Sequence, residues 1–262
     1  MHPRLRPLIL ACPVIALACH DPQGIAQGAL EARGVEDIRL LAAGSKGDFT
    51  FVGKRGQDDC SGTVAVQPHD DATSAKLALE CLPPAGAWTS SLPAGVDPAT
   101  VAQARRCDGG IAPACTALGL LFHAGEGVPK DQARANMLFN QGCANQDAEG
   151  CYRMATSLLA TGPGRDAEVD KLLVDACDLG SAVACGQAAQ RLYNADVQDQ
   201  VPTLARVARK GCDADEPQAC LVLGVLLAYG LGMPLDMDQA RRRLMQACGA
   251  KLESACELVE SL

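Results

Sequence analysis

The chain has 262 residues, of which only 3% are aromatic, and its formal net charge is −8. This length allows one or two domains with a sizeable core. The acidic balance leaves no basic stripe that could neutralise phosphates, so we exclude nucleic acid as a partner. Two short arginine runs, Arg105-Arg106 and Arg241-Arg242-Arg243, fall on predicted helices, and we interpret them as solvated faces.

Residues 1–18 have the form of a secretory signal peptide. Two arginines precede an apolar stretch over residues 8–18, which is too short to span a membrane. Ala16-Leu17-Ala18 fits ordinary signal cleavage, but the same residues followed by Cys19 resemble the lipobox of bacterial lipoproteins. We therefore expect an exported chain that is either lipid-anchored at Cys19 in the bacterial cell envelope, on its periplasmic or outer-membrane side, or secreted.

The number of cysteines favours the lipid-anchored form. The chain has 14 cysteines, and cleavage before Cys19 removes Cys12 and leaves an odd number. If Cys19 carries lipid, all the cysteines that follow can pair, which leaves no reactive thiol in an oxidising compartment. Export also allows the cysteines to be read as disulfides. We expect the chain to meet a membrane through this lipid anchor only.

A small α+β module is predicted over residues 23–82. A helix is expected at 23–33, strands at 35–41, 48–52, 60–67 and 76–81, and a hairpin connection at 53–59. Cys60 and Cys81 are the only cysteines in this module, and we predict that they pair and staple two neighbouring strands. No known family is identified for it.

Residues 83–97 are rich in proline, glycine and serine and are predicted to be a linker. Trp88, the only tryptophan, lies within this segment, and we interpret it as a side chain that packs on a domain edge. From residue 98 onward the pattern is helical, and Asp97 before Pro98 predicts an N-cap. The expected helices are 98–107, 112–124, 131–143, 148–160, 166–177, 182–193, 200–211, 217–229, 237–248 and 253–261.

Ten cysteines form five pairs in which the two members stand eight residues apart. The pairs are Cys107/Cys115, Cys143/Cys151, Cys177/Cys185, Cys212/Cys220 and Cys248/Cys256. Successive pairs begin about 35 residues apart, a period typical of stacked helix pairs. The first cysteine of each pair ends one repeat and the second begins the next, so we predict disulfides that tie adjacent repeats together. Zinc sites favour shorter cysteine spacings, so no metal or cofactor is expected.

Two copies of the repeat match best, and they begin Cys115-Thr-Ala-Leu-Gly119 and Cys220-Leu-Val-Leu-Gly224. Both continue through Gly-x-Gly to an aspartate and an alanine. This pattern resembles the SEL-one-like repeat, a relative of the tetratricopeptide repeat, and its cysteine-rich secreted bacterial subgroup. The resemblance covers residues 98–262. With the α+β module it predicts a mainly α fold: an α-solenoid of about four and a half disulfide-stapled helix pairs.

The resemblance implies a non-catalytic scaffold that binds a protein or peptide on the concave face formed by the first helix of each repeat. We expect a monomer. Phe122, Leu158, Leu192 and Leu227 share the family's aromatic position and are assigned to the core. The candidates for partner binding, chosen by position, are His123, Tyr152, Arg153, Gln187, Arg191, Tyr193 and Tyr229.

The sequence contains no motif of a serine hydrolase, a phosphate-binding loop or a zinc peptidase. We therefore lean against an enzyme. Two alternatives stay open through resemblance alone. Cysteine-rich relatives imply a β-lactamase-like hydrolase or a penicillin-binding protein, and a cysteine-rich mitochondrial relative implies a factor for redox or metalloenzyme assembly.

Overall fold

The computed structural model describes residues 8–10, 21–43, 48–69, 72–195 and 198–262. It divides into two compact units, Met1–Ser91 and Leu92–Leu262. The boundary falls inside the segment expected to be a linker, where a short helix α2 (Ala87–Ser90) forms that the sequence does not predict. Trp88 lies on this helix and is half-buried. Cys12 and Cys19 lie outside the described residues, so the lipid anchor stays a prediction.

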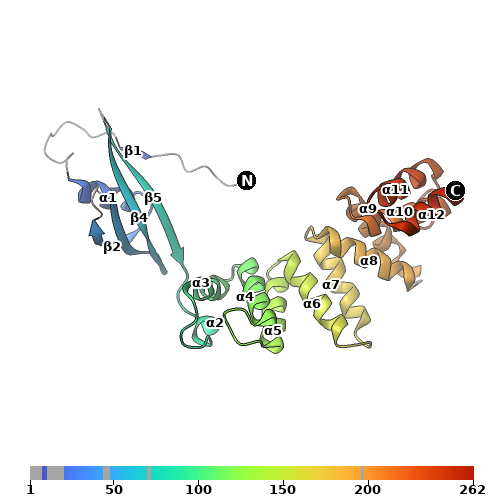
Figure 1. The fold of residues 1–262 in the computed structure, drawn as a ribbon, viewed down its shortest axis with the longest axis horizontal. Coiled ribbons are helices and arrows are strands. Elements are labelled where there is room, and N and C mark those ends of the chain that lie inside the picture. Colours follow the sequence, from blue (N-terminus) through green and yellow to red (C-terminus); the bar gives the residue numbers. More distant parts are fainter. Residues whose placement is uncertain (1–7, 11–20, 44–47, 70–71, 196–197) are drawn as a thin grey trace. The chain divides into compact units, whose positions relative to one another are not determined.

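The first unit is an antiparallel sheet with strand order β1-β5-β4-β3-β2 (Figure 1). Strands β3 and β4 are joined at Gly56 and Gln57, so the hairpin connection is shorter than the expected 53–59. Strand β1 lies within the segment predicted to be a signal peptide. The elements are β1 (Leu8–Leu10), α1 (Pro22–Glu31), β2 (Glu36–Ala43), β3 (Asp48–Arg55), β4 (Asp58–His69) and β5 (Ala72–Leu82).

The core of this unit lies between α1 and the sheet. Phe49, Phe51 and Val64 are buried together with Ala26 and Leu30 of α1. These residues alternate along their strands, which is why one face of the sheet is apolar. The Cys60–Cys81 disulfide joins directly opposed residues of β4 and β5, whose Cα atoms are 4.0 Å apart.

The second unit is a row of stacked helices, α3 to α12 (Figure 1). The expected boundaries agree with the structure to within two residues, the largest difference being at the end of α9, and α4 to α11 each have 13 residues. The predicted fold class is therefore confirmed. The helices are α3 (Pro98–Asp108), α4 (Ala112–Ala124), α5 (Gln132–Ala144), α6 (Ala148–Ala160), α7 (Asp166–Asp178), α8 (Ala182–Asn194), α9 (Val201–Asp213), α10 (Pro217–Tyr229), α11 (Met237–Gly249) and α12 (Glu253–Ser261), with a 3₁₀ turn at Gln198–Gln200.

Five junctions, from the second helix of one repeat to the first helix of the next, share one geometry. The middle residue of each has a positive φ, and the next residue donates its N–H back to the preceding helix, a Schellman-type ending. The middle residues are Gly110, Gln146, Gly180, Asp215 and Lys251. A disulfide closes every junction with a Cα–Cα distance of 4.4–4.7 Å: Cys107–Cys115, Cys143–Cys151, Cys177–Cys185, Cys212–Cys220 and Cys248–Cys256.

The turns inside the repeats vary instead. They connect α4 to α5, α6 to α7, α8 to α9 and α10 to α11. In the first and last of these turns, Gly125 and Gly230 end their helices in the left-handed region, as the Gly-x-Gly pattern predicts. The differences in repeat length therefore arise in these turns, while the stapled junctions stay constant.

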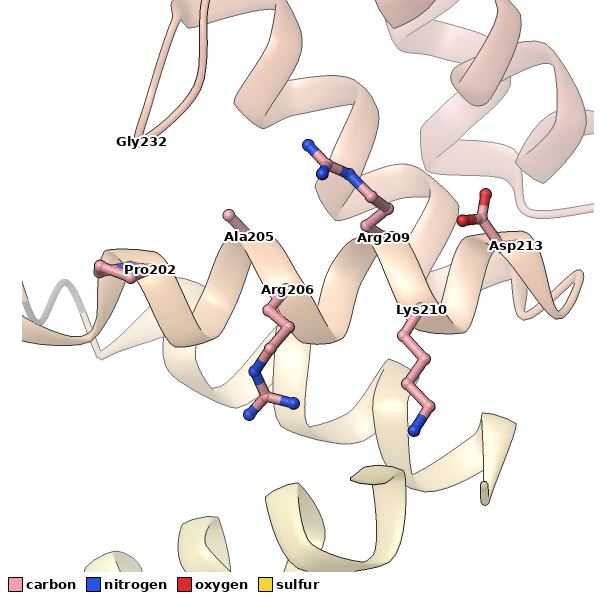
Figure 2. Close-up of a pocket in the computed structure, with 7 residues that line it drawn as sticks. All are labelled: Pro202, Ala205, Arg206, Arg209, Lys210, Asp213 and Gly232. Carbon is pink, nitrogen blue, oxygen red and sulfur yellow. The ribbon is translucent and has the colours of Figure 1, made fainter. Parts of the chain in front are cut away.

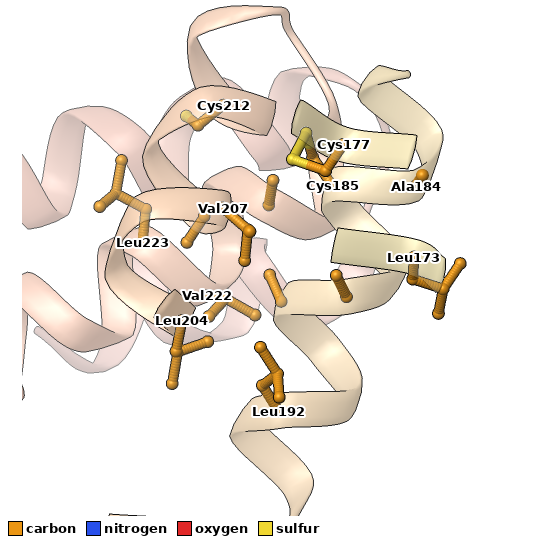
Figure 3. Close-up of a cluster of buried hydrophobic side chains, with 14 of the residues drawn as sticks. Leu173, Cys177, Ala184, Cys185, Leu192, Leu204, Val207, Cys212, Val222 and Leu223 are labelled. Atoms are coloured by element: carbon orange, nitrogen blue, oxygen red, sulfur yellow. A yellow bond between two sulfur atoms is a disulfide. The ribbon is translucent and has the colours of Figure 1, made fainter. Parts of the chain in front are cut away.

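The core of the helical unit is built from small and aliphatic side chains that interlock between neighbouring helices (Figure 3). The residues assigned to the core are buried, since Phe122, Leu158, Leu192 and Leu227 are at most 7% exposed. Close helix packing needs glycine at one point of the best-matching repeats: a Cβ added to Gly119 would lie 2.8 Å from Phe139.

Candidate functional site

The interface between α5 and α6 contains a cavity, called here the first-junction cavity; from here on the α5/α6, α7/α8 and α9/α10 pairs are called the first, second and third junctions. Its volume is about 450 Å³, and it lies where the end of α4, the start of α5 and the second half of α6 meet. Small-molecule and side-chain sites commonly have this size and combine apolar lining with a few polar groups. The cavity is lined by His123, Gln132, Asn136, Phe139, Arg153, Thr156, Ser157, Ala160 and Thr161.

Four polar lining residues form one hydrogen-bond network. Gln132 Nε2 donates to Asn136 Oδ1 at 2.8 Å and to Ser157 Oγ at 3.3 Å, and the Ser157 hydroxyl donates to Asn136 Oδ1 at 2.6 Å. Both amide hydrogens of Gln132 are thus used, so its Oε1, at 2.8 Å, accepts from Nδ1–H of His123. The other ring nitrogen, Nε2, takes no part in this network.

One small residue accounts for the cavity. Ser157 stands six residues after the second cysteine of its repeat, and Arg191 and Leu226 hold the same position in the next two repeats. Arg191 reaches Asp170 at 2.5 Å and Asp166 at 3.0 Å, and Leu226 is fully buried. Large side chains therefore occupy the position that Ser157 leaves open.

The contact between Arg191 and the two aspartates also shifts pKa values at the second junction. Burial by itself would lower the pKa of Arg191, but its hydrogen bonds to Asp170 and Asp166 outweigh burial and raise that pKa. The hydrogen bond from Arg191 is in turn the main reason why the pKa of Asp166 lies below its ordinary value. The guanidinium of Arg191, a predicted partner-binding residue, is thus engaged within the fold.

Three other predicted residues lie together on α6 and α8. Gln187 Nε2 donates to the Tyr152 hydroxyl at 3.1 Å, which links two successive repeats. Arg153 pairs with Glu149 at 2.6 Å, and its guanidinium lies 5.9 Å from the centre of the Tyr152 ring. Of the predicted set, Arg153 and His123 both line the first-junction cavity.

The two remaining tyrosines lie elsewhere. Tyr193 and Tyr229, near the ends of α8 and α10, are 39% and 66% exposed, and neither lines the first-junction cavity. Tyr193 takes the position in its repeat that His123 takes in the first. The predicted binding residues therefore do not meet in one continuous site.

Gln132, Asn136 and Ser157 were not among the sequence candidates. The first two lie on α5, a second helix of a repeat, whereas the sequence candidates lie on first helices. Ser157 is small and neutral, so its side chain alone does not mark it as a binding residue. Comparing Ser157 with Arg191 and Leu226 across the repeats is the sequence signal that identifies it.

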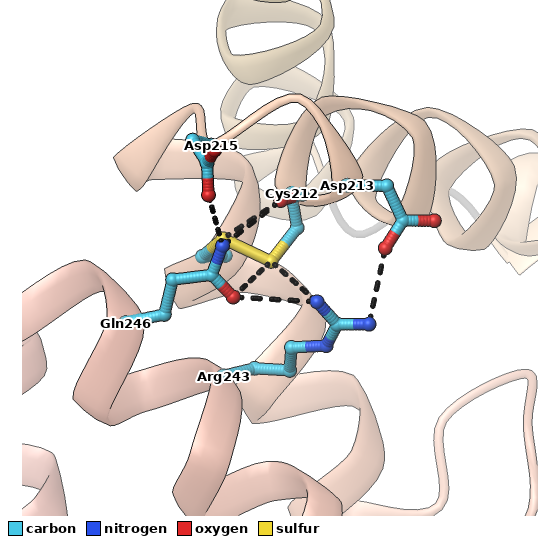
Figure 4. A network of polar contacts seen from close by, with 6 residues as sticks. Cys212, Asp213, Asp215, Arg243 and Gln246 are labelled. Carbon is cyan, nitrogen blue, oxygen red and sulfur yellow. Dashed lines mark hydrogen bonds and ion pairs between the residues drawn. A yellow bond between two sulfur atoms is a disulfide. The ribbon is translucent and has the colours of Figure 1, made fainter.

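Polar side chains of α11 that reach the third junction, at the end of α9, support the fold (Figure 4). Gln246 Nε2 donates to the carbonyl oxygen of Cys212 at 3.2 Å and to Asp215 Oδ1 at 2.7 Å, and Arg243 pairs with Asp213 at 3.0 Å. The bond to Cys212 provides a hydrogen-bond donor for a carbonyl group at the end of α9, and all these contacts link α11 to α9. The prediction that the whole run Arg241-Arg242-Arg243 is a solvated face is therefore wrong for Arg243, because that residue reaches across to a neighbouring helix.

Within the described residues, no group of three or more histidine, cysteine, aspartate or glutamate side chains is arranged to hold a metal ion. A search of the same part of the chain finds no helix with the length and hydropathy needed to cross a membrane.

Comparison with known proteins shows which family the helical repeats are similar to. Residues 112–147 and 217–242 match the Sel1 repeat family. A search of curated proteins finds no significant match. Among solved structures, a protective antigen of uropathogenic Escherichia coli that displays an SLR fold has a TM-score of 0.53 at 21% identity. The match covers 62% of this chain and 35% of the other.

Two further solved structures are similar over part of the chain. A Sel1 repeat protein from Oxalobacter formigenes has a TM-score of 0.49 at 18% identity, with 58% of this chain and 63% of the other covered. The cysteine-rich protein B of Helicobacter pylori has a TM-score of 0.38 at 25% identity, with 49% of this chain and 95% of the other covered. The chain thus spans less than two thirds of the Oxalobacter and Escherichia proteins. Two segments of its helical unit thus match the Sel1 repeat, and disulfides staple the array that contains them.

Proposed function

We propose that this protein is an exported bacterial scaffold, lipid-anchored at Cys19, that binds a segment of a partner protein without catalysing a reaction. Six disulfides within the part of the chain that the structure describes support an oxidising compartment. The Sel1-like array supports binding, because stacked repeats present long continuous surfaces to partners. The surface carried by the first helices is the proposed docking face.

The first-junction cavity is the single observation that carries the proposal. Its wall offers donors at Arg153 and an acceptor in the Thr156 hydroxyl, which donates its own hydrogen to the Arg153 carbonyl oxygen, next to the apolar ring of Phe139. A peptide segment carries both a donor and an acceptor in every amide group, together with side chains of the size that this cavity holds. A partner's chain crossing α6 could therefore satisfy the polar wall and place one apolar side chain against Phe139.

The alternative of a β-lactam hydrolase finds little support at this site. Ser157 is the serine in the cavity, and its hydroxyl donates to Asn136, an amide that cannot take up a proton. A serine nucleophile needs a base in that place. Purified oxidised protein should therefore leave the chromogenic β-lactam nitrocefin intact, and steady turnover would favour the enzymatic alternative.

Filling the first-junction cavity tests the proposed function. Ser157→Leu gives the first junction the residue that the third junction has at Leu226, so the fold should accept it. We expect a partner captured from envelope extract by the wild-type chain to be lost with Ser157→Leu. Glu126→Leu, which places a leucine on the exposed turn at the position of Leu231, is the matched control and should retain the partner. Equal capture by all three proteins would contradict the proposal.

A further inference from the structure

The exposed face of α9 carries a second hollow, unrelated to the first-junction cavity. Its volume is about 580 Å³, and it is lined by Pro202, Ala205, Arg206, Arg209, Lys210, Asp213 and Gly232. Ala205 and Pro202 supply an apolar floor, and Gly232 borders it from the turn between α10 and α11 (Figure 2). From Pro202 to Asp213 the helix rises about 16 Å, the length of about five extended residues.

Three cations flank this hollow. Arg209 lies on the side of α9 nearer to Gly232, and Arg206 and Lys210 point to the other side (Figure 2). Arg206 pairs with Asp178, and Lys210 Nζ donates to the carbonyl oxygen of Asp178 at 2.7 Å. Both side chains are thus held in place before any ligand arrives, which lowers the entropy cost of binding.

The three cations are particular to α9. At the positions of Arg206, Arg209 and Lys210, no other second helix carries three cations. The residues there are Val101, Ala104 and Arg105 in α3, Met137, Asn140 and Gln141 in α5, Lys171, Val174 and Asp175 in α7, and Arg242, Met245 and Gln246 in α11. Residues 201–250 contain six basic and five acidic side chains, although the whole chain has a net charge of −8. The fold does not require this cationic face, since the other repeats form without it.

The turn that borders the hollow is apolar, and the equivalent turn of the first repeat is its internal control. The two turns have the same backbone: Gly230 and Gly232 have φ of 67° and 69°, against 80° and 70° at Gly125 and Gly127. Four exposed positions carry different residues in the two turns. Ala124, Glu126, Lys130 and Gln132 in the first turn correspond to Tyr229, Leu231, Leu235 and Met237 in the last. In the last turn, Tyr229, Leu231, Leu235 and Met237 are 66%, 45%, 62% and 41% exposed, respectively.

We propose that the α9 hollow and the apolar turn beside it bind an acidic peptide segment that carries apolar side chains at one end. Glutamate or aspartate side chains of the segment lie between Arg209 on one flank and Arg206 and Lys210 on the other. Its apolar end packs on Tyr229, Leu231 and Leu235. The first turn has the same backbone without apolar side chains of this size at these positions, so the turn itself does not require them. Charge complementarity argues for an acidic occupant. A peptide fits better than a bilayer, because the cations flank a hollow that a flat lipid surface cannot enter.

The test uses a fluorescent peptide with leucines at one end and glutamates along the rest, titrated with the full chain by fluorescence anisotropy. We expect saturable binding that weakens as salt rises, because the ion pairs between the peptide carboxylates and the three cations are exposed to solvent. Arg209→Glu should weaken it about tenfold. Lys171→Glu, a charge reversal on the exposed face of α7, is the matched control and should bind as the wild type does. Binding that is equally strong for a peptide with lysines in place of glutamates would overturn the proposal.

A second variant tests the apolar turn without changing net charge. Tyr229→Ala, Leu231→Glu, Leu235→Lys and Met237→Gln together give the last turn the residues that the first turn already carries on the same backbone. The fold should therefore persist, as circular dichroism can check, and peptide affinity should fall about tenfold. Unchanged affinity would overturn the role of the turn. Sedimentation with phosphatidylglycerol vesicles in place of peptide binding would overturn the proposal in favour of a membrane.

The two proposed sites can fail separately. Ser157→Leu changes only the first-junction cavity and should leave binding of the acidic peptide unchanged. Arg209→Glu should leave intact the capture that depends on Ser157. If Ser157→Leu abolished peptide binding, the peptide would be reporting on the first junction and the α9 proposal would be wrong.

Discussion

At the first junction Ser157 touches two amides, Gln132 and Asn136, whereas at the second junction Arg191 touches two carboxylates, Asp166 and Asp170. The backbone is the same in both, with one positive-φ residue and one disulfide. The comparison teaches that the staple fixes the path of the chain, so that the central side chain is free to vary. A cavity in one junction and an ion pair in the next are therefore compatible with one fold.

The third junction should be the most sensitive to the removal of its central side chain. Leu226 is fully buried, so Leu226→Ala should lower the free energy of unfolding by about 3 kcal/mol. Urea unfolding followed by circular dichroism measures this loss. Ser157→Ala, the matched change at the first junction, should cost less than about 1 kcal/mol. Equal losses would mean that the first junction is as tightly packed as the third, which contradicts the cavity.

Removing one disulfide tests whether that bond holds the backbone of a junction in place and so allows the side chains there to vary. The double variant Cys177→Ser and Cys185→Ser should lower the free energy of unfolding by about 2.5 kcal/mol, because it frees a short loop in the unfolded chain. Differential scanning calorimetry under oxidising conditions measures the effect. A loss near zero would show that the Schellman-type ending holds the junction without the bond.

The ion pairs of the second junction predict a pH dependence that the first junction lacks. The pKa of Asp166 lies below its ordinary value of 3.8 in the folded chain. A carboxylate of this kind stabilises the fold above pH 3.8 and loses that contribution as the pH falls through its lower, folded pKa. Arg191→Met should therefore lower the melting temperature at pH 7, and the difference from wild type should shrink below pH 3.8. A difference that is constant down to low pH would contradict the ion pairs.

The smallest expected effect concerns the positive-φ residue of the last junction. Lys251 has a φ of 68°, where glycine replaces it in two other junctions. Lys251→Gly should raise the free energy of unfolding by about 0.5 kcal/mol, since relief of backbone strain exceeds the added entropy of the unfolded chain. A thermal melt checks the sign, and destabilisation would mean that the lysine side chain makes a contact that the junction needs.

Most of the helical unit could be predicted from its sequence because the cysteines fix its register. Each pair marks the end of one helix and the first turn of the next, so the helix limits follow to within two residues. The sheet was predicted less well. Strand β5 runs Ala72–Leu82 instead of 76–81, because its length is set by pairing with β4 rather than by its own alternation. The short elements β1 and α2 had no periodic signal to read.

The candidate site is harder to predict because the cavity arises where a large side chain is missing, at Ser157. Large or charged residues were sought on first helices, and Arg191 met those criteria although its charge is engaged within the fold. Ser157 met neither criterion. Only the comparison with Arg191 and Leu226, at a position that faces the same junction in each repeat, shows that a small residue there leaves room.

Hydrogen–deuterium exchange on the complex with a captured partner tests the central claim most directly. The account predicts slower exchange on binding at the end of α4, the start of α5 and the second half of α6, and no such slowing in the Ser157→Leu variant. Slower exchange confined to helices away from the first junction, with these three segments unchanged, would contradict it.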